Sequence, residues 1–254
     1  MKVQYCSDLH LEFPENEKFM KENPLISIGD ILILAGDILP FVLLDKKIQF
    51  FIDASNNFEH VYWIPGNHEY YGSDIKDIKT PLNKKIFKNV TLLDNKTVKI
   101  NNVNFIFSTL WSKISEQNIF NIQRSVNDFK AIKSYGTNLC GLEFNLWHEN
   151  SLEFIKGEIN KSNKKGEKCV IVTHHVPTKL NYPEVYKNSS INEAFCTELF
   201  DFIYDSNAEY WIYGHHHFNT PQFEINKTKM ITNQLGYVRH GENETFEFNK
   251  HFEI

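Results

Sequence analysis

Arginine is scarce in this sequence. The 27 basic residues include only two arginines, Arg124 and Arg239, and the excess of acidic residues gives a net charge of −5. A broad nucleic-acid surface needs basic side chains that neutralise phosphates, so this charge balance argues against one. A site that binds phosphate through a bidentate guanidinium has only these two candidates. Nucleic acid stays open as a partner but is not favoured over a small substrate.

Paired cysteines and long apolar runs are also missing. Cys6, Cys140, Cys169 and Cys196 form no Cys-x-x-Cys pair and show no disulfide-dense spacing. No apolar stretch is long enough to cross a bilayer. A predicted strand begins within the first five residues, which leaves no room for a signal peptide. These absences predict a cytoplasmic protein with free thiols and no membrane partner, and they leave the oligomeric state open.

A short aliphatic run at residues 31–35 ends in Gly36 and Asp37. A uniformly apolar run of this length is typical of a strand buried on both faces, as in sheets that are covered by helices. Further buried strands are expected at residues 3–7, 61–64, 169–172 and 210–213. Strands alternate with helical patterns early in the chain, hairpins follow later, and no linker or repeat stands out. A single α/β domain is therefore the simplest prediction.

Apolar spacing and breaker residues predict the remaining elements. The expected helices cover about 42–55, 74–88, 118–130 and 145–161, the last two within a partly irregular segment around 111–162. Residues 190–193 (Ser-Ile-Asn-Glu) have the form of a capping box and predict a helix through residue 202. Prolines 14 and 24 favour a loop over residues 11–29. The expected strands are 90–93, a hairpin of 96–100 and 103–108, and short strands around 221–226, 229–233 and 244–254.

Residues of the types that commonly bind metals come immediately after five of the predicted strands. Open α/β sheets place their ligands at the carboxyl ends of the strands. The full set is Asp8 and His10, Asp37, Asn67 and His68, His174, and His215 and His217. In Asp8-x-His10 and His215-x-His217 an extended backbone puts both side chains on one face, so both can reach one point. Imidazole nitrogens with carboxylate and amide oxygens suit Mn, Fe or Zn.

The order and spacing of these blocks resemble the calcineurin-like metallophosphoesterases. The matching blocks are Asp8-x-His10, Gly36-Asp37, Gly66-Asn67-His68-Glu69, His174 after a strand, and Gly214-His215-x-His217. Residues 109–111, 127–129, 173–177 (Thr-His-His-Val-Pro) and 233–237 resemble a bacterial branch of that superfamily. The resemblance implies a single domain over residues 1–254. It also implies the fold, a four-layer αββα sandwich of two mixed sheets flanked by helices.

The resemblance further implies a dinuclear metal centre. One ion would be held by Asp8, His10, Asp37 and His217, and the other by Asp37, Asn67, His174 and His215. Asp37 would bridge the two ions, with Mn expected first and Fe or Zn as alternatives. His68 would contact the substrate phosphate and the leaving group, and Glu69 would lie beside it. A metal-bridging hydroxide would then hydrolyse a small phosphate mono- or diester.

One departure from the branch pattern lies near the carboxyl terminus. The branch usually reads Asn-Pro-Arg-Gly-Tyr, whereas residues 233–237 of this chain read Asn-Gln-Leu-Gly-Tyr. If that arginine binds substrate, this chain lacks it, because Leu235 stands in its place. Arg239 is the residue that could substitute for it.

Three further residues lie near the blocks, and the function has alternatives. His175 is expected to support its neighbour His174 rather than bind metal. Asp128 and Arg124 could line the pocket, although helix-surface charges are the simpler interpretation. The alternative function is a nuclease or cyclic-nucleotide phosphodiesterase on the same scaffold. A non-catalytic docking scaffold is disfavoured, because none of the metal-binding residue types is missing from the blocks and His68 is present.

Overall fold

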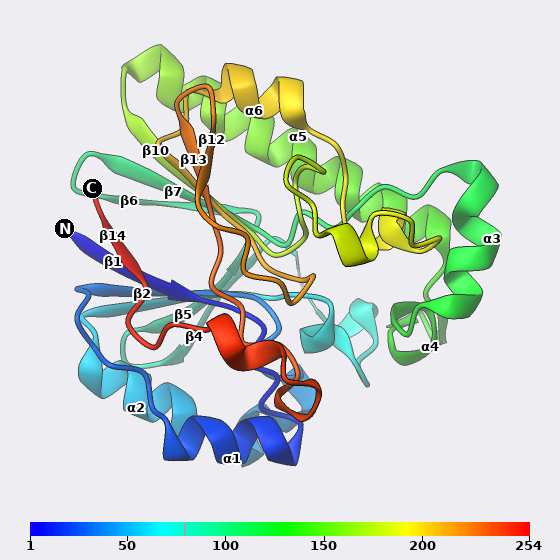
Figure 1. The fold of residues 1–254 in the computed structure, drawn as a ribbon, viewed down its shortest axis with the longest axis horizontal. Helices are drawn as coiled ribbons and strands as arrows, with labels where there is room; N and C mark the ends of the chain where they lie inside the picture. Colours follow the sequence, from blue (N-terminus) through cyan, green and yellow to red (C-terminus); the bar gives the residue numbers. More distant parts are fainter. Residues whose placement is uncertain (79) are drawn as a thin grey trace.

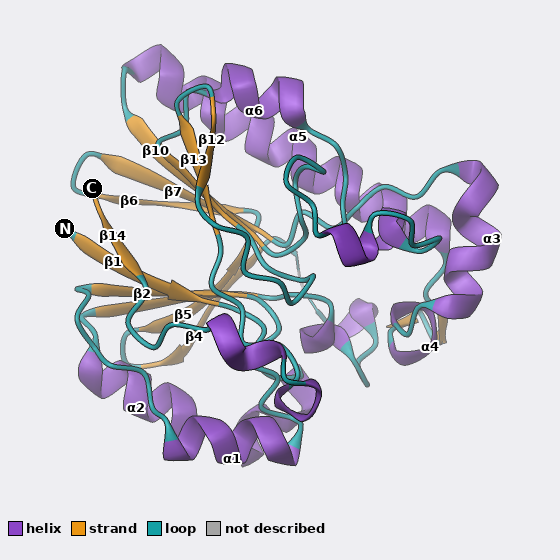
Figure 2. Cartoon of the chain, in the orientation of Figure 1, coloured by secondary structure: helices purple, strands orange, loops and turns teal. Residues whose placement is uncertain are grey.

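The computed structural model describes residues 1–78 and 80–254. Its two six-stranded sheets pack face to face, with helices on both outer faces (Figure 2). Each sheet has four parallel central strands and an antiparallel strand at either edge, so both sheets are mixed. This arrangement confirms the predicted four-layer αββα sandwich.

The two sheets divide the chain roughly in sequence order. The first contains, in spatial order, β14 (His251–Glu253), β1 (Lys2–Cys6), β2 (Ile31–Ala35), β3 (His60–Ile64), β5 (Val90–Asp94) and β4 (Leu82–Phe87). The second contains β12 (Phe223–Ile225), β13 (Thr228–Ile231), β11 (Tyr210–Ile212), β10 (Lys168–Thr173), β7 (Val103–Ser108) and β6 (Lys96–Ile100). A separate ribbon pairs β8 (Lys133–Ser134) with β9 (Thr137–Asn138).

The helices form the two outer layers and one projecting end. The α-helices are α1 (Pro14–Glu22), α2 (Gln49–Asn57), α3 (Glu116–Ser125), α4 (Asp128–Ala131), α5 (Gly141–Lys165) and α6 (Phe200–Ser206). The 3-10 turns are η1 (Phe41–Lys46), η2 (His68–Tyr70), η3 (Ile75–Asp77), η4 (Glu184–Tyr186), η5 (Asn192–Ala194), η6 (Val238–His240) and η7 (Glu242–Thr245). In Figure 1, α1 and α2 lie below the first sheet and α5 and α6 above the second, while α3 and α4 project at one end.

Strand β2 explains why its sequence is uniformly apolar. Ile31 and Ile33 face the core between the two sheets. Leu32 and Leu34 face the core between the first sheet and helices α1 and α2. Each of these side chains is at most 2% exposed. A strand covered on both faces cannot alternate apolar and polar residues. Cys6 and Cys169, two of the thiols predicted to be free, are unpaired and buried in the structure.

The loop predicted over residues 11–29 is wrong, because α1 lies within it. Pro14 is the first residue of this helix. The first turn of a helix has no use for the missing proline N–H, so a proline there starts a helix instead of breaking one. The long helix predicted over 42–55 is shorter than expected, because the 3-10 turn η1 precedes α2.

The helix predicted over 74–88 is wrong, because β4 occupies residues 82–87. β4 pairs antiparallel with β5 at the edge of the first sheet. The predicted helix at 118–130 is divided into α3 and α4, and α5 is longer than expected at both ends. The strand predicted over 244–254 is confined to β14, since η7 takes up its beginning. Tertiary pairing overrides local propensity in such segments.

The helix predicted from the capping box at residues 190–193 is wrong. Only the turn η5 forms there, and α6 begins at Phe200. Glu193 accepts hydrogen bonds from the backbone N–H and hydroxyl of Ser115 (2.7 and 2.8 Å) and from Asn118 (2.9 Å) instead. The carboxylate therefore joins this segment to the start of α3 rather than capping a helix of its own.

The buried outer face of β2 predicts a large mutational cost. Leu34→Ala should lower the free energy of unfolding by about 2–5 kcal/mol, because it leaves a cavity in a packed core. The matched control is Leu142→Ala on α5, whose side chain is 72% exposed. Urea denaturation followed by circular dichroism measures both variants. Equal losses in the two variants would contradict this assignment of the core.

Candidate metal centre

The predicted metal-binding side chains meet where the central strands of both sheets end. Asp8, His10 and His217 each offer a ligand atom within 4.8 Å of the others, and Asp37, His174 and His215 form a second such group. The first group joins the ends of β1 and β11, and the second joins β2, β10 and β11. The two sheets therefore converge on one site, as expected for strands that end at the same edge.

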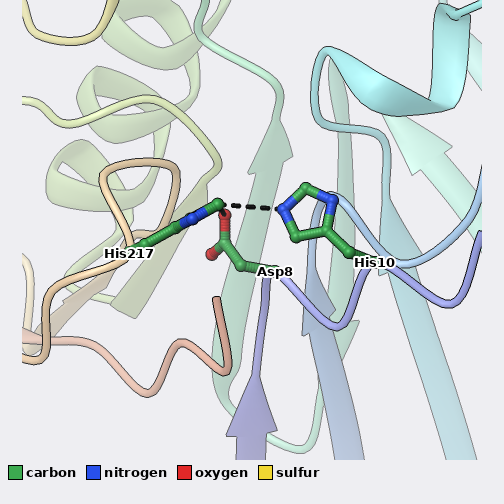
Figure 3. Close-up of side chains that lie close together, drawn as sticks. All are labelled: Asp8, His10 and His217. Atoms are coloured by element: carbon green, nitrogen blue, oxygen red, sulfur yellow. Dashed lines mark hydrogen bonds and ion pairs between the residues drawn. The ribbon is translucent and has the colours of Figure 1, made fainter. Parts of the chain in front are cut away.

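In the first group two imidazoles face each other. The Nε2 atoms of His10 and His217 are 2.9 Å apart, and Asp8 Oδ1 is 3.5 Å from His217 Nε2 (Figure 3). The Nδ1 atom of each ring meets a carboxylate, Glu12 at 3.2 Å from His10 and Glu242 at 2.7 Å from His217. A carboxylate on Nδ1 holds the proton there and leaves the Nε2 lone pair facing the site.

The second group is built in the same way around His174. Its Nδ1 atom lies 2.9 Å from the Ala35 carbonyl oxygen and is placed to donate to it. Its Nε2 atom lies 3.1 Å from His215 Nδ1 and 3.4 Å from Asp37 Oδ2. The Nε2 atom of His215 is buried without a hydrogen-bond partner among the described residues. The facing nitrogens of His174 and His215 therefore contact each other, as those of His10 and His217 do in the first group.

Asp37 lies between the two groups. Its Oδ2 atom is 3.7 Å from His10 Nε2 and 3.4 Å from His174 Nε2, while its Oδ1 atom accepts the His68 N–H at 2.9 Å. Burial by itself would raise the pKa of this carboxyl, but His174 and His68 outweigh it and hold the pKa well below its usual value. An ionised carboxylate therefore joins the two groups.

The amide of Asn67 is oriented by Asp128. Asn67 Nδ2 donates to Asp128 Oδ1 at 2.8 Å, and the Tyr71 hydroxyl donates to the same oxygen at 2.7 Å. The amide nitrogen therefore faces Asp128, which leaves the amide oxygen facing the site. That oxygen is buried and unpartnered within residues 1–78 and 80–254. Asp128 thus lies at the site, whereas Arg124 is exposed on α3 and stacks on Phe120.

His68 is held on two sides. Its Nδ1 atom lies 2.7 Å from Glu12 Oε1, and its ring stacks on Tyr71 at a centroid distance of 4.2 Å. Burial would lower the pKa of His68, but the carboxylates of Asp37 and Glu12 outweigh it and raise the pKa above its usual value. The ring is therefore fixed in position and favours the protonated form.

Glu69 and His175 support the site from behind. Glu69 is fully buried and accepts from the backbone N–H groups of Asp37 (2.9 Å) and Gly66 (2.7 Å), which joins the loops after β2 and β3. The His175 ring packs 4.1 Å from that of His215, and burial lowers its pKa well below the usual value. Neither residue lines the pocket described below.

The backbone at the site is unusual. Five of the candidate ligands have left-handed φ angles, which are Asp8 (56°), His10 (47°), Asp37 (55°), His215 (80°) and His217 (52°). Non-glycine residues in this region cost about 1–3 kcal/mol each and gather at functional sites. The packing is also tight, since a Cβ atom at Gly66 would lie 2.2 Å from Asp37 Oδ1. The loops therefore hold these side chains close together at an energetic cost.

A pocket of about 420 Å³ opens beside the two groups. Its floor includes Asp37, Asn67, His68, His215 and His217. Its walls include five aromatic side chains, Tyr71, Tyr182, Tyr186, Phe195 and Tyr237. Leu235 does not line the pocket, because its side chain is buried in the core between the first sheet and helices α1 and α2.

Sequence reasoning missed the carboxylates of Glu12 and Glu242 and most of the aromatic wall. Glu12 continues the alternate spacing of Asp8 and His10, and that pattern could have revealed it. Glu242 comes from the turn η7, which has no such pattern. Arg239 stacks on Tyr237, with its guanidinium carbon 5.7 Å from the ring centroid, and is outside the pocket lining.

Comparison with known proteins identifies the family of this chain. Residues 1–219 match the family model described as calcineurin-like phosphoesterase. Uncharacterized protein L509 of Acanthamoeba polyphaga mimivirus is 34% identical over 264 aligned positions, which cover 92% of this chain and 91% of that protein. The phosphopantetheinyl hydrolase of Mycobacterium tuberculosis has the same fold, with a TM-score of 0.73 at 15% identity over 99% of this chain and 95% of that one.

The family match assigns the protein to a class of metal-dependent hydrolases. The match spans the strands that carry all the candidate metal-binding residues. In the described part of the chain, no helix is both long and apolar enough to cross a bilayer. The protein belongs to the calcineurin-like phosphoesterases.

Proposed function

We propose that the protein is a dinuclear metal-dependent phosphoesterase. The observation that carries this proposal is the Asp37 carboxylate, which contacts His10 of one candidate metal group and His174 of the other. Both contacts are made by Oδ2, so this single oxygen faces both groups and could bridge two ions. The pocket beside it is of a size that suits a small phosphorylated substrate.

The residues fit two divalent ions. Asp8, His10, Asp37 and His217 would hold one ion, and Asp37, Asn67, His174 and His215 the other. The lone pairs of His10, His217 and His174 are directed at the site by partners on the opposite ring nitrogen, as is usual for histidine ligands. Mixed nitrogen and oxygen donors suit Mn, Fe or Zn, with Mn the first candidate. Bound ions of this kind supply a hydroxide nucleophile and neutralise charge on the phosphoryl oxygens.

His68 is proposed as the proton donor to the leaving group. Its Nδ1–H is held by Glu12, so its Nε2–H is the proton that can be given away. His68 lines the pocket beside Asn67 and Asp37, where the ester oxygen of a bound substrate would lie. Proton donation by such a group contributes about 10²–10⁴ in rate. Glu12 acts through His68 and is a positioning residue.

The first prediction concerns metal content. Protein loaded with Mn²⁺ should bind two ions per chain, and Asp37→Ala should weaken both because Asp37 serves both groups. His215→Ala is the comparison, since it should weaken one ion while the other stays bound. Elemental analysis after dialysis gives the stoichiometry, and thermal melting checks the fold. Two ions retained in Asp37→Ala would contradict a bridging role.

The second prediction separates proton donation from structural support. His68→Ala should slow hydrolysis of an ester with an alkyl leaving group by about 10²–10⁴ and retain both metals, because an alkoxide needs the proton. The loss should be much smaller with p-nitrophenolate, which departs without help. Equal losses for both leaving groups would remove His68 from this role.

The third prediction concerns Glu12. Glu12→Ala should slow the alkyl ester by about 10–100-fold, the usual cost of removing a partner behind a functional histidine. Glu12 also holds the candidate ligand His10, so elemental analysis must first show that the variants keep both metals. With the metals retained, the Glu12→Ala/His68→Ala double variant should be no slower than His68→Ala alone, because both act through one proton. Multiplicative losses in the double variant would show that Glu12 acts independently of His68.

A further inference from the structure

Carboxylates crowd the candidate metal centre. Asp8 and Asp37 belong to the metal groups, and Glu12, Glu69, Asp128 and Glu242 each hydrogen-bond to a residue of those groups. Six carboxylates outnumber the four positive charges that two divalent ions would bring, so the centre has no surplus of positive charge.

The pocket adds no cation of its own. Across residues 1–78 and 80–254, no lysine or arginine is among the side chains that line it. Arg239 is directed elsewhere, with its guanidinium over the rings of Phe13 and Tyr237 and its Nε donating to His240 at 3.2 Å. A dianionic phosphate monoester would therefore bring two negative charges to a site that has no surplus of positive charge. A diester brings only one.

The walls of the pocket fit a flat, uncharged group. Tyr182, Tyr186 and Phe195 come from the segment between β10 and α6, and the Phe195 ring stacks on His215 at a centroid distance of 4.7 Å and 24°. Uncharged polar side chains lie among them, including Asn127 and Asn192. Aromatic rings stack on planar groups, and amide side chains can bond to the edges of such groups.

We propose that the substrate is a small phosphodiester with one negative charge, in which the alcohol that remains on phosphorus carries a planar, uncharged group such as a nucleoside base. This inference rests on the proposed function. Water oxygen forms a new bond to phosphorus, the ester P–O bond breaks, and the other alcohol leaves with a proton. The product is a monoester with a second negative charge, which the crowded carboxylates disfavour, so the same charge balance promotes its release.

Three substrates with the same p-nitrophenolate leaving group test the effect of substrate charge and the role of the aromatic pocket wall separately. They are p-nitrophenyl phosphate, methyl p-nitrophenyl phosphate and thymidine 5′-(p-nitrophenyl) phosphate, assayed with Mn²⁺. We expect kcat/KM to be at least tenfold higher for the methyl diester than for the monoester, and higher again for the thymidine diester. A monoester hydrolysed as well as the diesters, with His68→Ala impaired on an alkyl monoester, would overturn this inference while supporting the proposed function. No hydrolysis of any of the three would overturn both.

The wall is tested with matched variants of Tyr186, which is only half-buried. Tyr186→Ala should lower the ratio of kcat/KM for the thymidine diester to that for the methyl diester by about 5–100-fold, the usual worth of stacking a base on an aromatic ring. Tyr186→Phe keeps the ring and should keep the ratio. Tyr135→Ala is the control, because that side chain is 79% exposed and outside the pocket. Equilibrium dialysis of thymidine against the same variants, without added metal, gives a readout independent of turnover.

Two results would count against the substrate proposed for this pocket. An unchanged ratio together with unchanged thymidine binding in Tyr186→Ala would overturn the planar-group part of the proposal. Faster, salt-sensitive cleavage of a single-stranded oligonucleotide than of the thymidine diester would overturn the assignment of a small substrate.

Discussion

The structure depends on one buried charge, the carboxylate of Asp37. A charge at the end of a strand that is apolar on both faces is costly unless it is paired. Asp37 meets this requirement through two imidazoles, His10 from the first sheet and His174 from the second. The packing of the sheets and the pairing of this charge are therefore linked, since His174 reaches Asp37 only when the two sheets are stacked. The core and the site stabilise the same arrangement.

A set of hydrogen-bond acceptors around the candidate metal-binding side chains holds them in position. Glu12, Glu242 and the Ala35 carbonyl oxygen each hold one nitrogen of a histidine, and Asp128 turns the Asn67 oxygen toward the site. These acceptors determine which atoms of the metal-binding side chains face the pocket. Their carboxylates also add negative charge around the site, so the same residues that position the ligands influence which substrate charge the site favours. The left-handed backbone at five candidate ligands shows that the loops are held in place against their own preference.

Sequence reasoning located the candidate site because of a local rule. Each candidate ligand follows directly on a buried strand, and parallel strands of one sheet end at a common edge, so this rule places Asp8 and Asp37 together. His174 follows a strand of the other sheet, and its place beside them was implied by the family resemblance. The four-layer fold followed from the family resemblance. Glu242 and Tyr186 escaped because they come from turns, where no periodic pattern marks a residue that becomes a neighbour only after folding.

The same limit explains the errors in secondary structure. Residues 82–87 form a strand because β5 offers an unpaired edge, and residues 190–199 lose their predicted helix because Glu193 binds the start of α3. In both cases a distant partner decides the conformation. Pro14 was misjudged for a different reason, since its position within a helix reverses its meaning.

The central claim is that one aspartate joins two metal sites. Anomalous diffraction from crystals grown with Mn²⁺ tests it most directly. We expect two peaks about 3.5–4 Å apart, as in other two-metal sites, with an Asp37 oxygen coordinating each. A single peak, or two peaks of which one makes no contact with Asp37, would contradict the account.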